Sequence, residues 1–364
     1  MIINKNWLIT LLTSTRSKLF TTLIVSVYLC GIMFWQSNNF KAIDPIPAIK
    51  TLNEKAQRLA NRITTGLHIN SFPTFSFNKN DFVVDGLLWF KFQNGTEALK
   101  SLESFTFQHC LITNGGDMLF RSAPIIKLLK DHVLVCYHIQ VECRADLNHK
   151  NFPFGSRRLT LIMQNRDITP RELYFESSNS NLTIAQDNLV QSWRPALAYV
   201  KTGYVEAKLL ENHADNASVA YPVAVFSIDF ENVGTRDLIS LYFPMFVLFL
   251  IALFCLLIDV SDTARLGYVA AAVPILVLFR MVIDSVSPDV GYTTHLDFMY
   301  NLFVFLSLVI LFFQTYVVLR LQNIKKTGVE SQANVQKQLS ITNDLVFFGT
   351  LFALAFISSM TFFR

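Results

Sequence analysis

Long apolar runs and stretches of alternating polarity divide the chain into a membrane part and a sheet-rich part. The apolar runs lie at 19–35, 238–258, 266–285, 298–319 and 345–363, and each is long enough to cross a bilayer as a helix. Between the first two runs lie roughly 200 mainly polar residues, the size of one folded domain. The pattern predicts an N-terminal membrane helix, then a folded domain, then a four-helix membrane domain.

The polar region begins with a helical period and continues with a strand period. Apolar residues repeat at three- and four-residue steps at Ile49, Leu52, Ala56, Leu59 and Ile63, which predicts an amphipathic helix ending at Gly66. From Phe72 onward the period is two, and strands are predicted at 82–93, 104–107, 132–141, 158–163, 172–175, 182–190 and 223–230. Many short strands without long helical patterns favour an antiparallel β-sandwich.

Charges flanking the apolar runs predict the orientation in the membrane. Lys5, Arg16 and Lys18 precede the first run, and the link between the fourth and fifth runs is also basic. The link after 285 instead carries Asp289 and Asp297. The positive-inside rule then places the N-terminus in the cytoplasm. We expect a cytoplasmic N-terminus and retained membrane anchor over 1–37, an amphipathic helix and linker over 38–71, an outer β-sandwich domain over 72–237, and a four-helix transmembrane domain over 238–364 with a short cytoplasmic link at 320–343.

Composition narrows the functional class. Hydrophobic residues make up 52% of the 364 residues, and the formal net charge is only +4, which favours a membrane protein and gives no reason to expect a nucleic-acid partner. The five cysteines and seven histidines are scattered, without the spacing of a disulfide framework or a zinc site. With no nucleophile–base pair or phosphate loop either, we predict a protein that is not an enzyme and has no cofactor, catalytic residue or metal site.

Four motifs follow one another in a suggestive order. The strand FVVDGLLWFKF at 82–92 is followed by Phe152-Pro153-Phe154, by Arg236 before the second apolar run, and by the helical hairpin 263–303 with Pro288, Tyr292 and Asp297 in its link. This order resembles bacterial pentameric ligand-gated ion channels. The chain lacks the loop disulfide of the animal members, with Ala145 and Leu159 at the matching positions, and Gly155 stands where the family usually has Asp.

The resemblance implies a homopentamer, with four further copies of this chain around a central pore in a bacterial inner membrane and the β-domain in the periplasm. Its implied pore-lining residues are Gly267, Ala271, Pro274, Leu278, Met281 and Ser285. Its implied coupling residues are Phe152, Pro153, Phe154, Arg236, Pro288, Tyr292 and Asp297. Aromatic candidates for binding a small-molecule ligand are Trp89, Tyr174, Phe175 and Tyr204. Membrane lipid is the remaining expected partner.

Several residues also have simpler explanations. Arg280 and Asp284 are four apart on one helix, a spacing that favours an ion pair, and Arg280 could instead contact the outer domain during gating. Asp297 suits a helix cap. Gly267 and Ala271 stand where conducting relatives usually have polar side chains, and Pro274 stands at the usual apolar gate. The alternative function is therefore a non-conducting sensor, accessory or structural subunit on the same scaffold.

Overall fold

The computed structural model divides into two compact units. It describes residues 14–39, 48–51, 61–93, 102–108, 119–144, 147–154, 157–185, 190, 193–208, 218–232, 236–324 and 329–362. The helical unit comprises Met1–Phe40, His149–Gly155 and Gly234–Arg364, and the sheet unit comprises Lys41–Asn148 and Ser156–Val233. The short segment 149–155 therefore belongs to the helical unit, although its flanking strands belong to the sheet unit.

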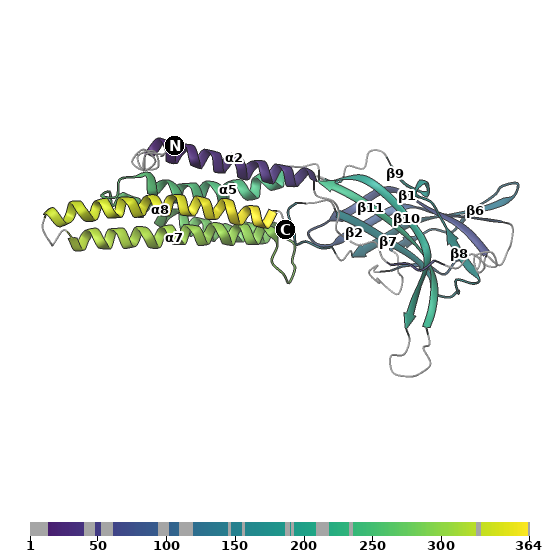
Figure 1. The fold of residues 1–364 in the computed structure, drawn as a ribbon. Helices are drawn as coiled ribbons and strands as arrows, with labels where there is room; N and C mark the ends of the chain where they lie inside the picture. Colours follow the sequence, from purple (N-terminus) through teal and green to yellow (C-terminus); the bar gives the residue numbers. More distant parts are fainter. Residues whose placement is uncertain are drawn as a thin grey trace, which may run out of the picture. The chain divides into compact units, whose positions relative to one another are not determined.

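Two β-sheets form the sheet unit (Figure 1). The first has the order β4-β6-β2-β1-β8, with β5 also paired to β6 and β9 to β1; the second has the order β10-β11-β7-β3. The strands are β1 (Asn61–Ser76), β2 (Asp81–Gln93), β3 (Phe105–Gln108), β4 (Phe120–Arg121), β5 (Ile125–Leu128), β6 (His132–Arg144), β7 (Arg157–Asn165), β8 (Leu173–Glu176), β9 (Leu182–Ile184), β10 (Trp193–Lys208) and β11 (Ser218–Asn232).

Both sheets contribute to one hydrophobic core. Alternate residues of β2, among them Phe82 and Phe90, are fully buried, as are Phe226 and Phe230 on β11 of the other sheet. The Phe75 ring makes a tilted contact with the Phe230 ring at a centroid distance of 4.9 Å. Because side chains alternate between the faces of a strand, the period-two pattern selects which face of each sheet enters this core.

The predicted helix ending at Gly66 is wrong at its C-terminal end, because β1 already begins at Asn61. Ile63 is fully buried in the sheet core, and Thr64, Thr65 and Gly66 pair with residues of β2. β-branched residues pack well on a pleated surface, so pairing outweighed the local helical period. Leu52, Ala56 and Leu59 lie outside the described residues. The strands also begin well before 72, where the sandwich domain was expected to start.

Each predicted strand has a counterpart in the structure, one of them is shorter than expected, and β4, β5 and β10 were not predicted. β9 ends at Ile184 rather than at 190, and β10 is an unpredicted strand from Trp193 to Lys208 that pairs along its length with β11. β8 and β9 run parallel to β1, so the first sheet is mixed rather than wholly antiparallel.

Within the described residues, the helical unit contains five long helices: α2 (Thr15–Asn39), α5 (Arg236–Phe254), α6 (Ala264–Val286), α7 (His295–Ile324) and α8 (Val329–Phe362). All five are long and apolar enough to cross a membrane, which confirms the five predicted apolar spans and indicates a multi-pass membrane protein. The expected link at 320–343 is mainly helical, because α7 continues to Ile324 and α8 begins at Val329. Residues 325–328 lie outside the described part.

Helix α2 lies beside α8 and runs in the same direction (Figure 1). The Lys18 ammonium forms a buried ion pair with Asp344, and further along both helices the Tyr28 and Ser359 hydroxyl oxygens lie 2.7 Å apart. The start of α2 and the start of α8 therefore lie at the same end of the unit. The side of the membrane on which this end lies stays a prediction.

Candidate coupling site and α6 face

Segment 149–154 docks on the link between α6 and α7. The backbone N–H of His149 donates to the Tyr292 hydroxyl oxygen at 2.7 Å. The backbone N–H of His295 donates to the Lys150 carbonyl at 2.7 Å, and that of Leu296 donates to the Phe152 carbonyl at 3.1 Å. The first two backbone donors of α7 are thus satisfied by the loop, where a helix start otherwise leaves them unpaired.

The aromatic residues of this segment belong to the core of the helical unit. Phe152, Pro153 and Phe154 are all buried, and Phe154 is only 2% exposed. The Phe154 ring lies 5.7 Å from the Tyr242 ring of α5 and 5.4 Å from the His295 ring of α7. The hydrogen bonds and the ring contacts together hold the loop on α5 and α7.

Arg280 joins the end of α6 to the start of α7. Its Nε lies 2.8 Å from Asp284 Oδ1, and its Nη1 lies 2.6 Å from Asp297 Oδ1. The guanidinium also lies over the Tyr300 ring at 5.6 Å. The expected i,i+4 pair is confirmed, and the contact with Asp297 adds a link between the two helices that sequence spacing does not reveal.

Asp297 takes part in a reciprocal cap at the start of α7. Its Oδ2 accepts from the Thr294 backbone N–H at 2.9 Å and from the Thr294 hydroxyl at 2.7 Å. In return, the Thr294 Oγ1 accepts from the Asp297 N–H at 3.2 Å. This is the capping-box arrangement, so the predicted cap is confirmed, and Thr294 is its unpredicted partner. The Thr-x-x-Asp spacing was the available signal.

The two remaining predicted coupling residues differ in position, because Pro288 lines a surface hollow together with Tyr292 and Asp297, whereas Arg236 does not. Arg236 is exposed at the first residue of α5, and Pro288 is buried in the α6–α7 link. Within the described residues, no hydrogen bond or ion pair joins either of them to segment 149–154. The structure therefore gathers Phe152, Pro153, Phe154, Tyr292 and Asp297 around the start of α7 and leaves Arg236 outside.

The predicted pore face of α6 is exposed in the single chain. All six residues are exposed: Gly267, Ala271, Pro274, Leu278, Met281 and Ser285. The opposite side of α6, including Val269, Leu276 and Ile283, is buried against the rest of the unit. The Ser285 hydroxyl donates to the Val282 carbonyl at 2.7 Å, so the single hydroxyl of this face is bound to its own helix.

Arg265 points into the helical unit rather than along the predicted pore face. It is 1% exposed, its Nε donates to the Cys255 carbonyl at 3.1 Å, and its Nη2 donates to Asn343 Oδ1. The Asn343 amide in turn donates to the Leu256 carbonyl at 2.7 Å. The network ties the end of α5 to α6 and α8.

In the α5–α6 link, two hydrogen bonds from Ser261 to Asp259 hold the pKa of that carboxyl below its usual range.

The aromatic ligand candidates do not form one box within the chain. Phe175 is a fully buried core residue near Phe90, and its contact with a ligand stays a prediction. Trp89 and Tyr174 precede these core residues on β2 and β8, and strand alternation places them on the opposite face of the same sheet. Tyr204 belongs to β10 of the other sheet, where its backbone pairs with Lys50.

Comparison of the chain with protein-family models and with curated protein sequences gave no match. No family assignment is therefore shown. The functional proposal rests on the docked segment 149–154 and on the exposed face of α6.

Proposed function

We propose that this chain is a subunit of a ligand-gated ion channel. Five copies surround a pore lined by α6 in a bacterial inner membrane, and the sheet unit in the periplasm receives a small-molecule ligand. Segment 149–154 carries the signal to the α6–α7 link. The docking of that segment is the observation that carries this proposal.

The connectivity of the chain supports this proposal. β6 ends at Arg144 and β7 begins at Arg157, and the segment between them has its aromatic side chains buried in the helical unit. A rearrangement of these two strands therefore acts through the covalent chain on Tyr292 and on the first turn of α7. Coupling of this kind requires an element that both sites bias, and the α6–α7 link is the candidate element.

The exposed face of α6 supports the placement of this helix at a central axis. Gly267 and Ala271 are small enough to let neighbouring helices approach closely. Leu278 is 63% exposed and Met281 is 73% exposed, and a ring of such side chains can close a pore by excluding water. A five-fold arrangement gives these apolar residues a common environment that the single chain does not supply.

The polarity of the same face favours a second candidate, a non-conducting sensor, accessory or structural subunit. Ser285 contributes the one hydroxyl of the six residues, and that hydroxyl is bound to Val282. Pro274 lies inside α6, where it removes one backbone hydrogen bond of the helix. A pore of this composition resists hydration, so an assembly that transmits signals without carrying ions is the competing proposal.

The test combines a subunit count with an ion-flux comparison of two matched variants. Native mass spectrometry of the purified chain should give five subunits. Leu278→Ser on the α6 face should raise ion flux into liposomes, because a ring of hydroxyls hydrates an apolar constriction. Leu319→Ser is the control, since Leu319 is 56% exposed on α7 and lies off the proposed pore; its flux should match that of the unmodified protein.

The outcomes separate the two candidates. Pentamers with raised flux in Leu278→Ser alone support the channel. Pentamers without flux in any variant support the non-conducting subunit. A different subunit number refutes the pentameric assembly on which both depend.

A further inference from the structure

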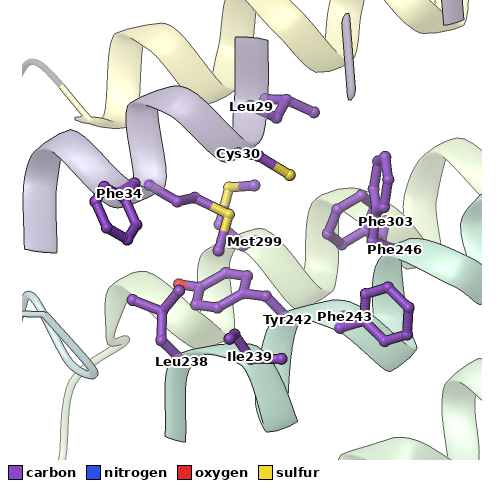
Figure 2. A pocket seen from close by; sticks show the side chains of 11 residues that line it. Leu29, Cys30, Phe34, Leu238, Ile239, Tyr242, Phe243, Phe246, Met299 and Phe303 are labelled. Carbon is purple, nitrogen blue, oxygen red and sulfur yellow. The ribbon is translucent and has the colours of Figure 1, made fainter. Parts of the chain in front are cut away.

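An apolar cavity of about 200 Å³ lies between α2, α5 and α7 (Figure 2). Eleven side chains line it, four from α2, five from α5 and two from α7, and none of them is charged. Helix α2 thus supplies one wall of the cavity. The parallel packing of α2 on α8, with the Lys18–Asp344 ion pair, helps to keep that wall in place.

The cavity opens onto the exposed apolar surface of the helical unit. Its floor includes Leu29 and Met299, which are 5% and 2% exposed. Its rim includes Phe34, Ile239 and Phe243, whose exposed fractions lie between 56% and 63%. These three residues belong to helices long and apolar enough to cross the membrane, so their exposed side chains meet hydrocarbon, and a chain from the bilayer can enter sideways.

Tyr242 gives the cavity one polar group. Its side chain is 4% exposed, and its hydroxyl has no hydrogen-bond partner among the described residues. Figure 2 shows the Tyr242 ring among the cavity-lining side chains, with its oxygen toward Leu238. A buried hydroxyl without a partner destabilises the protein. The hydroxyl oxygen is itself covered by neighbouring atoms, so an acceptor oxygen of a ligand satisfies it once a lining side chain moves aside.

The depth of Tyr242 indicates the kind of acceptor. The apolar span of α5 begins at Leu238, and Tyr242 lies four residues further, roughly 6 Å along the helix axis. Tyr side chains at this depth belong to the interfacial zone of a bilayer, where the ester groups of phospholipids join their acyl chains. The purely apolar remainder of the lining suits an alkyl chain and offers nothing to a charged headgroup.

We propose that this cavity binds one acyl chain of a membrane phospholipid, whose ester carbonyl accepts a hydrogen bond from Tyr242. The site requires α2 and is independent of ion conduction and of subunit number. An apolar cavity of about 150 Å³ is already large enough to hold benzene, so this one accommodates a segment of an alkyl chain.

The first test uses the full-length protein in phosphatidylcholine bilayers that contain a phosphatidylcholine with a diazirine on its acyl chain. After irradiation, peptide mapping should place the label on the cavity walls of α2 and α5. Leu29→Trp fills the cavity and should lower that labelling at least fivefold. Leu23→Trp is the matched control, because Leu23 is 60% exposed on the same helix and does not line the cavity. Labelling of this variant should stay within about twofold of that of the unmodified protein, which is less than the roughly fivefold change that one hydrogen bond produces. Equal labelling in both variants overturns the proposal.

A second test avoids any disturbance of packing. Tyr242→Phe removes only the hydroxyl, and the probe is supplied in ester-linked and ether-linked forms. The unmodified protein should prefer the ester form by about fivefold, the equivalent of one hydrogen bond, and Tyr242→Phe should lose this preference while its total labelling persists. An ester preference that is absent from the unmodified protein, or unchanged in the variant, refutes the assigned acceptor.

Discussion

The two carboxylates bound by Arg280 should contribute unequally to stability. Asp284 is 57% exposed, whereas Asp297 is only 13% exposed, and the Arg280 side chain between them is 39% exposed. Water screens the first pair strongly and the second pair weakly. A double-mutant cycle with Arg280→Met, Asp297→Asn and Asp284→Asn separates the two contributions.

The expected magnitudes follow from these exposures. Removing one partner of a fully buried pair costs about 3–5 kcal/mol. Because Arg280 remains partly hydrated, we reduce this to a coupling of about 2 kcal/mol for Arg280 with Asp297. The exposed i,i+4 pair with Asp284 should give about 0.4 kcal/mol. The difference corresponds to more than tenfold in the unfolding equilibrium.

The assay is reversible unfolding of the full-length protein in mixed micelles of a mild and a denaturing detergent, followed by the loss of helical circular dichroism. Asp297→Asn keeps a side-chain oxygen for the two Thr294 donors, so the cycle isolates the ionic contact rather than the cap. Equal coupling energies for the two carboxylates, or a larger one for Asp284, would refute the reasoning from burial.

Three further predictions concern other parts of the chain. Thr294→Ala removes the reciprocal cap of α7 and should destabilise the helical unit by about 1 kcal/mol in the same unfolding assay. Gly66→Ala should destabilise the sheet unit by about 1–3 kcal/mol in thermal unfolding, because a Cβ at this position lies 2.3 Å from the Trp89 ring. Lys18→Met should lower the thermal stability of the full chain by about 3 kcal/mol, since it leaves Asp344 unpaired and largely buried.

Each of these predictions has a matched control. Thr293→Ala changes an exposed neighbour outside the cap and should have little effect. Gly291→Ala meets no atom within 4 Å of the added Cβ, so its stability should match that of the unmodified protein. Adding Asp344→Leu to Lys18→Met removes the unpaired carboxylate and should restore most of the loss. A Lys18 variant as stable as the unmodified protein, or a double variant less stable than the single one, would contradict the pairing.

Long apolar runs and local spacings were the most reliable signals in the sequence. The five apolar spans are confirmed because a run of about twenty apolar residues favours a membrane helix regardless of its neighbours. The Arg280–Asp284 pair and the Asp297 cap also follow from separations of three or four residues along one helix. In the same way, the alternation at 82–93 predicted a strand, and β2 is present there.

Contacts between distant segments required the structure. The residues near Gly66 fit a helical period, but they form a strand because they pair with β2 and β8. Phe175 fits a ligand box by residue type alone, and the facing sheet buries it. Arg280 reaches Asp297 across 17 positions, and segment 149–154 satisfies backbone donors of α7 more than 140 positions away.

The sequence by itself thus determined that this is a chain with five apolar helices and a β-rich domain, because those properties depend on neighbours within a few residues. Tertiary structure decided which loop satisfies the start of α7, which face of α6 stays exposed, and that α2 closes a cavity around the Tyr242 hydroxyl. These features depend on hydrogen bonds and burial between residues far apart in the chain, and local periodicity carries no information about them.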